Sequence, residues 1–322
     1  GVDELSVMPV AVSQAMQRAG RAGREGPGKC FRLYCEDALQ SLAPHITPEL
    51  LRANLGGVVL QLKAMKVDNI LYFPFIDPPP KEALVRSLEL LYALGALDKK
   101  GNLNASGRRM SRFPLEPMAA KAIVASADEG CSEDVIAVLS MLTTDSVFRF
   151  QGSNMSGERG RKNLGREQYA RKEGDHITLL EVFRAFRVCG VKRRREFCHT
   201  NAINLRAMLK ALDIFKQLTR AATHEGIEVK SAEEESAPLL RSMVAGYFLN
   251  TARKQADGSY RTVSTGQRLV IHPSSVLFQQ PPEMIIFNEL VKTNRLYARD
   301  VSSILPEWLA EMSPNVYSIR QE

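Results

Sequence analysis

The stretch Gln17-Arg18-Ala19-Gly20-Arg21-Ala22-Gly23-Arg24 is the most informative part of this sequence. It repeats arginine every three residues, and a glycine precedes each of the last two arginines. Glycine lets a backbone approach a ligand closely, and arginines three apart can lie on one helical face. A guanidinium group suits phosphate oxygens. The pattern favours phosphate binding by Arg21 and Arg24, with Gln17 able to orient a water molecule; the alternative is a flexible Arg/Gly-rich linker.

The flanks of this stretch argue against a linker. An apolar segment, residues 5–12, precedes it, and Cys30-Phe31-Arg32-Leu33-Tyr34 follows with the alternation of a β-strand. A generic linker would not be followed by a strand and then a capped helix. We therefore interpret residues 1–46 as the end of an α/β domain.

Residues 47–114 have the pattern of a winged helix. Thr47-Pro48-Glu49 predicts a helix start, and the leucines and valines of residues 50–62 fall on one helical face. A second helix carries leucines at positions 84, 88, 91 and 94, with Gly95 as its C-terminal cap. Residues 96–103 predict a small hairpin.

The rest of the chain divides into a helical bundle and a small β-barrel. In residues 115–228, Ser132 predicts a helix cap, and apolar residues recur at helical spacing in 176–188 and 202–222. Residues 226–238 are acidic, and we interpret them as a linker. Four β-rich stretches and the turn signal Asp257-Gly258 then predict an OB-type barrel within residues 229–322. The fold class is thus multidomain α+β.

Bulk properties narrow the class of partner. The net charge is +7 and the pI is about 9.2, a mild indication of a polyanionic partner. The five cysteines include no C-x-x-C pair, which favours a reducing compartment. Cys198 and His199 are adjacent but have no second pair at zinc-finger spacing, so we expect no metal site. No apolar run reaches the ~20 residues of a membrane span, and we find no signal peptide.

Several motifs together resemble the DEAH-box RNA helicases. Residues 17–24 match Q-R-x-G-R-x-G-R, motif VI of helicase superfamily 2. The other stretches that resemble this family are 26–34, Asp77-Pro78-Pro79, 113–117, 174–180 and 271–277. The resemblance implies the end of a second RecA-like domain, a winged helix, a ratchet-like bundle and an OB-fold. It also implies an ATP-dependent 3′–5′ RNA helicase that accepts several NTPs and serves splicing or ribosome biogenesis. We expect a nuclear or nucleolar protein, with the cytoplasm as a further location.

By the same resemblance, Gln17, Arg21 and Arg24 contact the nucleotide and carry the catalytic role. The chain contains neither G-x-x-x-x-G-K-[ST] nor Asp-Glu-x-His. We therefore expect ATP and Mg²⁺ to be held mainly by residues upstream of this chain. These 322 residues alone are predicted not to hydrolyse ATP. The implied partners are single-stranded RNA and a glycine-rich G-patch activator, and the implied oligomeric state is a monomer.

Three further groups are candidates for RNA contact. Asp175 predicts an N-cap for a helix starting at His176, and a helix N-terminus beside a histidine can also bind phosphate. Upstream lies a basic loop with Arg161 and Lys162, which in the alternative interpretation is only a solvated surface. The predicted RNA-facing loop of the barrel contains His272, Ser274 and Ser275, and Lys292 and Arg299 extend its positive wall.

Two other interpretations stay open at this stage. The chain could be a non-catalytic module that binds nucleic acid or a protein through its winged helix and OB-fold. It could also be a scaffold on which activators dock, which does not exclude helicase activity. The basic run Lys192-Arg193-Arg194-Arg195 is either an exposed loop tip or a nuclear-import signal.

Overall fold

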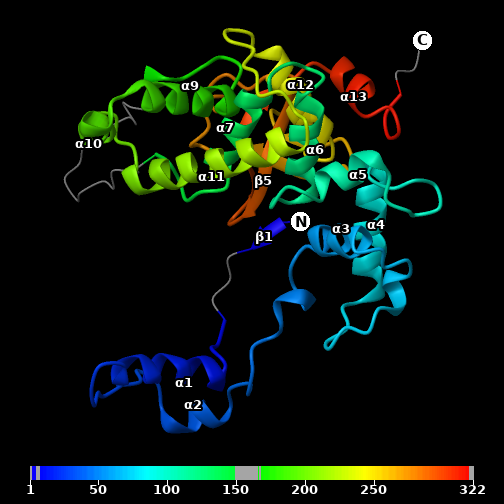
Figure 1. The fold of residues 1–322 in the computed structure, drawn as a ribbon. Helices are drawn as coiled ribbons and strands as arrows, with labels where there is room; N and C mark the ends of the chain where they lie inside the picture. Colours follow the sequence, from blue (N-terminus) through cyan, green and yellow to red (C-terminus); the bar gives the residue numbers. More distant parts are fainter. Residues whose placement is uncertain (1, 5–7, 149–165, 167, 319–322) are drawn as a thin grey trace.

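The helices of the N-terminal arm (described residues 2–4 and 8–46) lie apart from the rest of the chain (Figure 1). The computed structural model describes residues 2–4, 8–148, 166 and 168–318. The arm contains α1 (Val12–Gly20), the 3₁₀ turn η1 (Arg21–Gly23) and α2 (Glu36–Gln40). The first backbone amides of α1 donate hydrogen bonds to carbonyl groups about 30 residues later in the chain. Val12 N–H, for example, donates to the Ala43 carbonyl at 2.9 Å.

The strand predicted at Cys30–Tyr34 is not formed in this structure, whereas the assignment of residues 1–46 to the end of an α/β domain stays a prediction. These residues have no regular structure, and Phe31 is 82% exposed. A strand forms only beside a partner strand, and no strand lies alongside Cys30–Tyr34 within the described residues. The strand of the arm, β1 (Val2–Glu4), instead pairs in parallel with β5 (Met284–Lys292) of the C-terminal barrel.

The winged-helix region holds three helices and a small hairpin. Its elements are η2 (Glu49–Leu51), α3 (Gly56–Ala64), η3 (Ile70–Tyr72), α4 (Lys81–Ala93) and α5 (Ala105–Met110). The predicted second helix and its cap are confirmed, because α4 ends just before Gly95, whose φ is +70°. The hairpin is confirmed by the antiparallel bridge between Leu97 and Leu103.

The single helix predicted from Thr47 to Leu62 is wrong. The chain makes the short turn η2, unwinds, and starts again as α3. Asn54 Oδ1 accepts a hydrogen bond from Gly56 N–H at 2.9 Å, which satisfies an amide at the new helix start, whereas Thr47 makes no capping bond. Leu51 and Val58, predicted to share the buried face, are exposed.

The middle of the chain is a helical bundle. It consists of α6 (Pro117–Ser126), α7 (Ser132–Leu142), α9 (Asp175–Val188), η4 (Val191–Arg193), α10 (Arg194–Thr200), α11 (Leu205–His224) and α12 (Ala237–Tyr247). The periodicity predicted for the last long stretch is confirmed, because Met208, Leu212, Phe215 and Leu218 are all buried on α11. In Figure 1, α9 and α11 run side by side with α7 between them.

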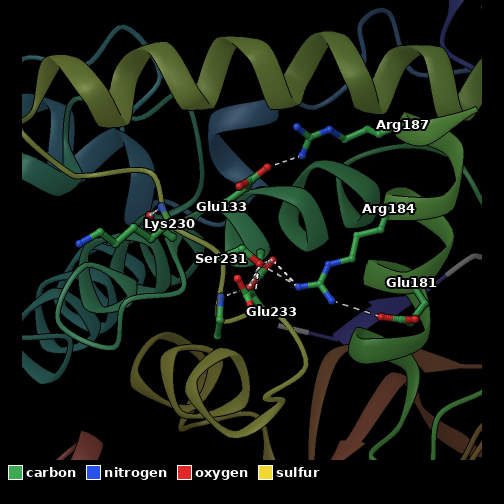
Figure 2. Close-up of polar contacts among 10 residues, drawn as sticks. Glu133, Glu181, Arg184, Arg187, Lys230, Ser231 and Glu233 are labelled. Carbon is green, nitrogen blue, oxygen red and sulfur yellow. Dashed lines mark hydrogen bonds and ion pairs between the residues drawn. The ribbon is translucent and has the colours of Figure 1, made fainter. Parts of the chain in front are cut away.

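The acidic segment 226–238 is fastened to α7 and is not a free linker. Asp134 Oδ2 accepts from the Ala232 amide at 2.8 Å, and Ser231 Oγ donates to Asp134 (Figure 2). Ser132 does not cap α7 as predicted. Its hydroxyl donates to the Glu228 carbonyl at 2.6 Å and accepts from the Lys230 amide. The Ser132 hydroxyl, which the sequence pattern assigned to helix capping, therefore bonds to a segment about 100 residues away in sequence.

The C-terminal strands form a closed barrel. The sheet order is β1-β5-β2-β3-β4-β6, and β5 also pairs with β6. The remaining strands are β2 (Thr251–Lys254), β3 (Tyr260–Thr262), β4 (Arg268–Ile271) and β6 (Leu296–Ser303), followed by α13 (Glu307–Met312). Four of these strands match predicted stretches and β2 was missed. The predicted turn is confirmed by Gly258, whose φ is +80°.

Bundle and barrel meet at Gly174, which precedes α9. Its φ is +121°, and a Cβ there would overlap the Val301 carbonyl oxygen and lie 2.5 Å from Ser302 Cα. Gly174 forms an antiparallel bridge with Ser302, and Ser303 N–H donates to the Glu173 carbonyl at 2.8 Å. The joint thus requires a residue without a side chain.

We predict that Gly174→Ala destabilises the chain more than Gly266→Ala. Gly266 also has a positive φ, +68°, but nothing lies near its missing Cβ. Gly266→Ala carries the positive-φ backbone penalty of about 1–2 kcal/mol. Gly174, with φ +121° and ψ −163°, lies in a region that essentially only glycine adopts, which costs other residues about 1–3 kcal/mol, and Gly174→Ala adds an overlap of about 1–3 kcal/mol. Urea unfolding followed by the fluorescence of Trp308, the single tryptophan, measures the difference. Equal losses in the two variants would contradict the close approach at Gly174.

Candidate functional site

Gln17, Arg21 and Arg24 lie on one continuous helical path. Gln17 belongs to α1, Arg21 begins η1, and Arg24 follows η1 with φ −71° and ψ −41°. With about 100° of turn per residue, the three side chains fall within roughly 60° of one another. Arg18 lies roughly 60–120° away by the same count. The backbone therefore places Arg21 and Arg24 on one face, as the spacing predicts, while their convergence on a ligand stays a prediction.

The same three side chains are exposed, and the two arginines present their charge to solvent. Within the described residues, none of them makes a hydrogen bond or an ion pair through its side chain. Both arginines therefore keep their full set of donors for a ligand. Open space beside Gly20 and Gly23 leaves the backbone accessible along this face. The arrangement suits a bound phosphate group.

Gly28 is a residue whose role the sequence did not reveal. A Cβ on Gly28 would overlap the Ala22 carbonyl and lie 2.6 Å from its carbon atom. The chain after motif VI therefore folds back onto η1 at this glycine. A conformational role could have been suspected from Gly26-Pro27-Gly28, a turn-rich sequence.

Asp175 holds the barrel and does not face RNA. It is fully buried, and the N-cap position of α9 is Gly174 rather than Asp175. Its Oδ1 accepts from Val276 N–H at 3.0 Å and its Oδ2 from Val301 N–H at 2.8 Å. Arg166 Nη2 lies 2.7 Å from the same carboxylate. The predictions of a capping role and of RNA contact are therefore wrong in this structure.

His176 is buried beside Asp175 and has no surface through which to contact RNA. Its Nδ1 lies 2.8 Å from Ser302 Oγ, and Ser302 Oγ also accepts from the His176 amide. A hydroxyl group can both donate and accept, so this contact is compatible with either tautomer of the ring. Burial lowers the pKa of His176 to about 4, and the ring is therefore neutral at pH 7. Its predicted RNA contact is replaced by a structural role.

The 272–275 loop is held by its own hydrogen bonds. His272 Nδ1 accepts from Ser274 N–H at 3.1 Å and lies 2.7 Å from Ser274 Oγ. The His272 ring packs edge-on against Tyr297, with centroids 5.4 Å apart. Burial and the nearby Arg299 and Arg166 lower the pKa of His272. Ser275 is buried and accepts from Leu277 N–H, so its predicted RNA contact is replaced by a turn-forming role.

Two of the predicted RNA residues line one cavity between bundle and barrel. Ser274 and Arg299 share a cavity of about 250 Å³ with Asn288, Asp300 and the residues that follow α7. Arg299 pairs across the sheet with Glu289 at 3.1 Å. Lys292, at the end of β5, is exposed and does not line this cavity. Arg161 and Lys162 lie outside the described residues.

A second cavity of about 480 Å³ adjoins the first and extends to the winged helix. The two share Leu142 and Asn288 as lining residues. Gln61 of α3, together with Glu116, lines the winged-helix side. Burial raises the pKa of Glu116. Sequence reasoning missed these residues because each comes from a different segment. We call the two cavities together the interdomain groove.

Two further kinds of feature, a metal site and a membrane span, are absent from the described residues. No three His, Cys, Asp or Glu side chains there come together as a metal site. No helix among those residues combines the length and apolarity needed to cross a bilayer.

We predict that Asp300→Asn stabilises the chain at neutral pH. Burial and the nearby Asp175 raise the pKa of Asp300 from 3.8 to about 6, so the folded chain holds this proton more tightly than the unfolded chain. The contribution of Asp300 to stability therefore falls as the pH rises from about 4 to 6. Asparagine also tolerates the φ of +51° at this position.

At pH 7.5 we expect a gain of about 1 kcal/mol in the free energy of unfolding, discounted for partial exposure, and almost none at pH 4. Urea unfolding at the two pH values measures it. Asp213→Asn, on the exposed face of α11, is the control and should change little at either pH. A gain that is the same at both pH values would contradict this assignment.

Three family models match successive parts of the chain. They are the winged-helix and the ratchet-like parts of the helicase associated domain (HA2), at residues 87–115 and 116–179, and the oligonucleotide/oligosaccharide-binding (OB)-fold, at residues 239–317. These matches agree with the predicted order of domains, while the exact boundaries 47–114, 115–228 and 229–322 stay predictions.

The chain is also similar to curated proteins over 98% of its length. It is 39% identical to the probable ATP-dependent RNA helicase DHX35 of Pongo abelii and covers 43% of that protein. It is 37% identical to the pre-mRNA-splicing factor ATP-dependent RNA helicases prp22 of Schizosaccharomyces pombe and DEAH10 of Arabidopsis thaliana, covering 27% and 45% of them. The chain thus spans less than half of each relative. With its three matched domains, it belongs to the DEAH-box RNA helicase family and corresponds to that family's C-terminal half.

Proposed function

We propose that this chain is the C-terminal part of an ATP-dependent RNA helicase that moves 3′ to 5′ along single-stranded RNA. The observation that carries the proposal is the shared, exposed face of Gln17, Arg21 and Arg24. On a helix, two guanidinium groups at this spacing can bind the same terminal phosphate. The names of the relatives support ATP as the nucleotide.

In the proposed mechanism, Arg21 and Arg24 neutralise the negative charge that develops on the γ-phosphate. Gln17, one helical turn before Arg21, orients the attacking water. An arginine in this role is worth about 10³- to 10⁵-fold in rate. Mg²⁺ supplies further charge neutralisation when it is bound. Since the sequence contains neither G-x-x-x-x-G-K-[ST] nor Asp-Glu-x-His, we assign Mg²⁺ and the rest of the ATP site to segments outside this chain.

We further propose that RNA lies along the interdomain groove. Ser274 and Arg299 supply phosphate contacts from the barrel side, and Lys292 extends the basic wall. His272 shapes the loop that presents Ser274. Contacts of this kind bind the RNA backbone and carry no sequence information. The predicted contacts of Arg161 and Lys162 stay proposals, because these residues lie outside the described ranges.

Partner and location are also proposals. A glycine-rich G-patch activator is proposed to bind the winged helix, which exposes large apolar side chains at Met65, Tyr72 and Ile76; Ile76 is 99% exposed. Exposed apolar clusters commonly mark protein-binding surfaces. A nuclear location is supported by relatives named as pre-mRNA-splicing factors. We propose that the protein acts as a monomer.

Arg24→Ala in the full-length protein should lower RNA-stimulated ATP turnover about a hundredfold or more while RNA affinity is retained. Arg18→Ala is the matched control, because Arg18 is an exposed arginine of the same motif that lies roughly 120° from Arg24 around the helix. Turnover of that variant should stay within about threefold of the unmodified protein. The 322-residue chain alone should not hydrolyse ATP. Unchanged turnover in Arg24→Ala would favour a nucleic-acid-binding module without catalysis.

Arg299→Ala should weaken RNA binding and reduce its salt dependence. Loss of one phosphate contact lowers the slope of log affinity against log salt by about 0.7 for a single strand. Arg268→Ala on β4 is the control, because Arg268 also pairs with a carboxylate, that of Asp257 at 2.7 Å, but does not line the groove. Fluorescence anisotropy with labelled oligouridine measures both variants. Equal slopes for Arg299→Ala and the unmodified chain would contradict this RNA path.

A further inference from the structure

Positive charge is concentrated at one end of the helical bundle. This end is formed by the last turn of α9, by η4 and α10, and by the first turns of α11, and α10 lies at the left edge of Figure 1. Residues 187–210 contain seven lysines and arginines and one acidic residue, a net charge of +6, whereas the whole chain has +7. Nearly the entire excess charge of the protein therefore belongs to 24 residues.

Two of the seven basic side chains are used inside the fold. Arg187 pairs with Glu133 (Figure 2) and stacks over Phe215 with its guanidinium carbon 4.8 Å from the ring centroid. Arg194 is half-buried and stacks over Phe186 at 5.0 Å. The other five are exposed and have no side-chain partner among the described residues. We call these five residues the basic tip: Lys192, Arg193, Arg195, Arg206 and Lys210.

The basic tip is presented by a well-anchored backbone. Phe197 of α10 packs on Phe186 of α9, with ring centroids 6.0 Å apart, and Cys198 is buried. Asn204 caps α11, accepting from the Arg206 amide at 3.1 Å. The charges therefore sit on short helical elements fixed to the bundle. A fixed array loses less conformational entropy on binding than charges on a flexible tail would.

The composition of the basic tip fits a polyanionic ligand better than a protein partner. Residues 187–210 expose five unpaired basic side chains but three large apolar ones, Val188, Val191 and Leu209. Only Glu196 offers a competing carboxylate. None of the five residues lines the interdomain groove. Unpaired Lys and Arg side chains with no pocket for a base bind phosphates without sequence preference.

We propose that the basic tip is a second RNA-binding surface, separate from the interdomain groove, that holds the phosphate backbone of RNA flanking the groove. This inference rests on the proposed function only in taking RNA as the substrate. Such a surface increases the effective concentration of RNA at the groove, because two linked contacts dissociate more slowly than one. It also gives a role to Lys192, Arg193 and Arg195, the exposed residues of the basic run.

The test is RNA binding by the 322-residue chain without nucleotide, measured by anisotropy with labelled oligouridine at several salt concentrations. The variant is Lys192→Ala/Arg193→Ala/Arg195→Ala. The matched control removes three exposed basic residues of the winged helix, Arg86→Ala/Lys99→Ala/Lys100→Ala. We expect the tip variant to bind at least about tenfold more weakly and to lower the salt slope by about 2. The control should change affinity less than about threefold.

Further variants separate charge from folding. Arg206→Ala/Lys210→Ala, on α11, should weaken binding in the same direction, so the outcome does not depend on η4 and α10 alone. Arg193→Lys/Arg195→Lys keeps the charge and should retain the salt slope. If the chain binds RNA but the tip and control variants behave alike, the basic tip is not an RNA surface and a protein partner gains support. If the unmodified chain binds no RNA, both this inference and the proposed RNA path fail, whereas the role of Arg24 in ATP turnover is tested separately.

Discussion

The buried carboxylate of Asp175 joins the two halves of the body. It accepts hydrogen bonds from Val276 and Val301, which belong to different segments of the barrel, and it neutralises Arg166 of the bundle. A buried charge is tolerated only when its hydrogen bonds are satisfied and its charge is paired. Because Val276 and Val301 lie more than 100 residues from Asp175 in sequence, this carboxylate helps to fix the position of the barrel relative to α9.

The interdomain groove depends on that joint. Its walls come from the end of α7, from β5 and β6, and from the 272–275 loop, so it exists only when bundle and barrel are docked. Gly174 permits the close approach of the backbones, and His176 and Ser302 complete the contact. The residues that sequence reasoning assigned to RNA at this point instead hold the walls on which RNA is proposed to lie.

Local patterns predicted most of the fold. The apolar spacing of α11, the leucines of α4, the turn at Gly258 and four strands of the barrel were all predictable from neighbours in sequence. The short strand β2 was missed because Thr251–Lys254 has no clear alternation and is defined by its partners β3 and β5. The misplaced strand at Cys30–Tyr34 had the right alternation but lacks a neighbouring strand.

The residues of the candidate site likewise include some that local sequence predicts and some that it does not. Gln17, Arg21 and Arg24 share a face because of helical geometry alone, and so the sequence sufficed. The burial of Asp175 and of Ser275 depends on segments about 100 residues away or on the closed barrel, and no local rule reveals it. Likewise, the run at 192–195 is visible in the sequence, but the internal use of Arg194 is not.

The pairing of β1 with β5 gives the N-terminal arm a second attachment. β1 is held in the barrel sheet, and the chain after the arm continues into the winged helix. The strand that pairs with β1, β5, also carries Asn288 and Glu289 in the wall of the interdomain groove. One strand therefore serves both as the attachment of the arm and as a wall of the proposed RNA path.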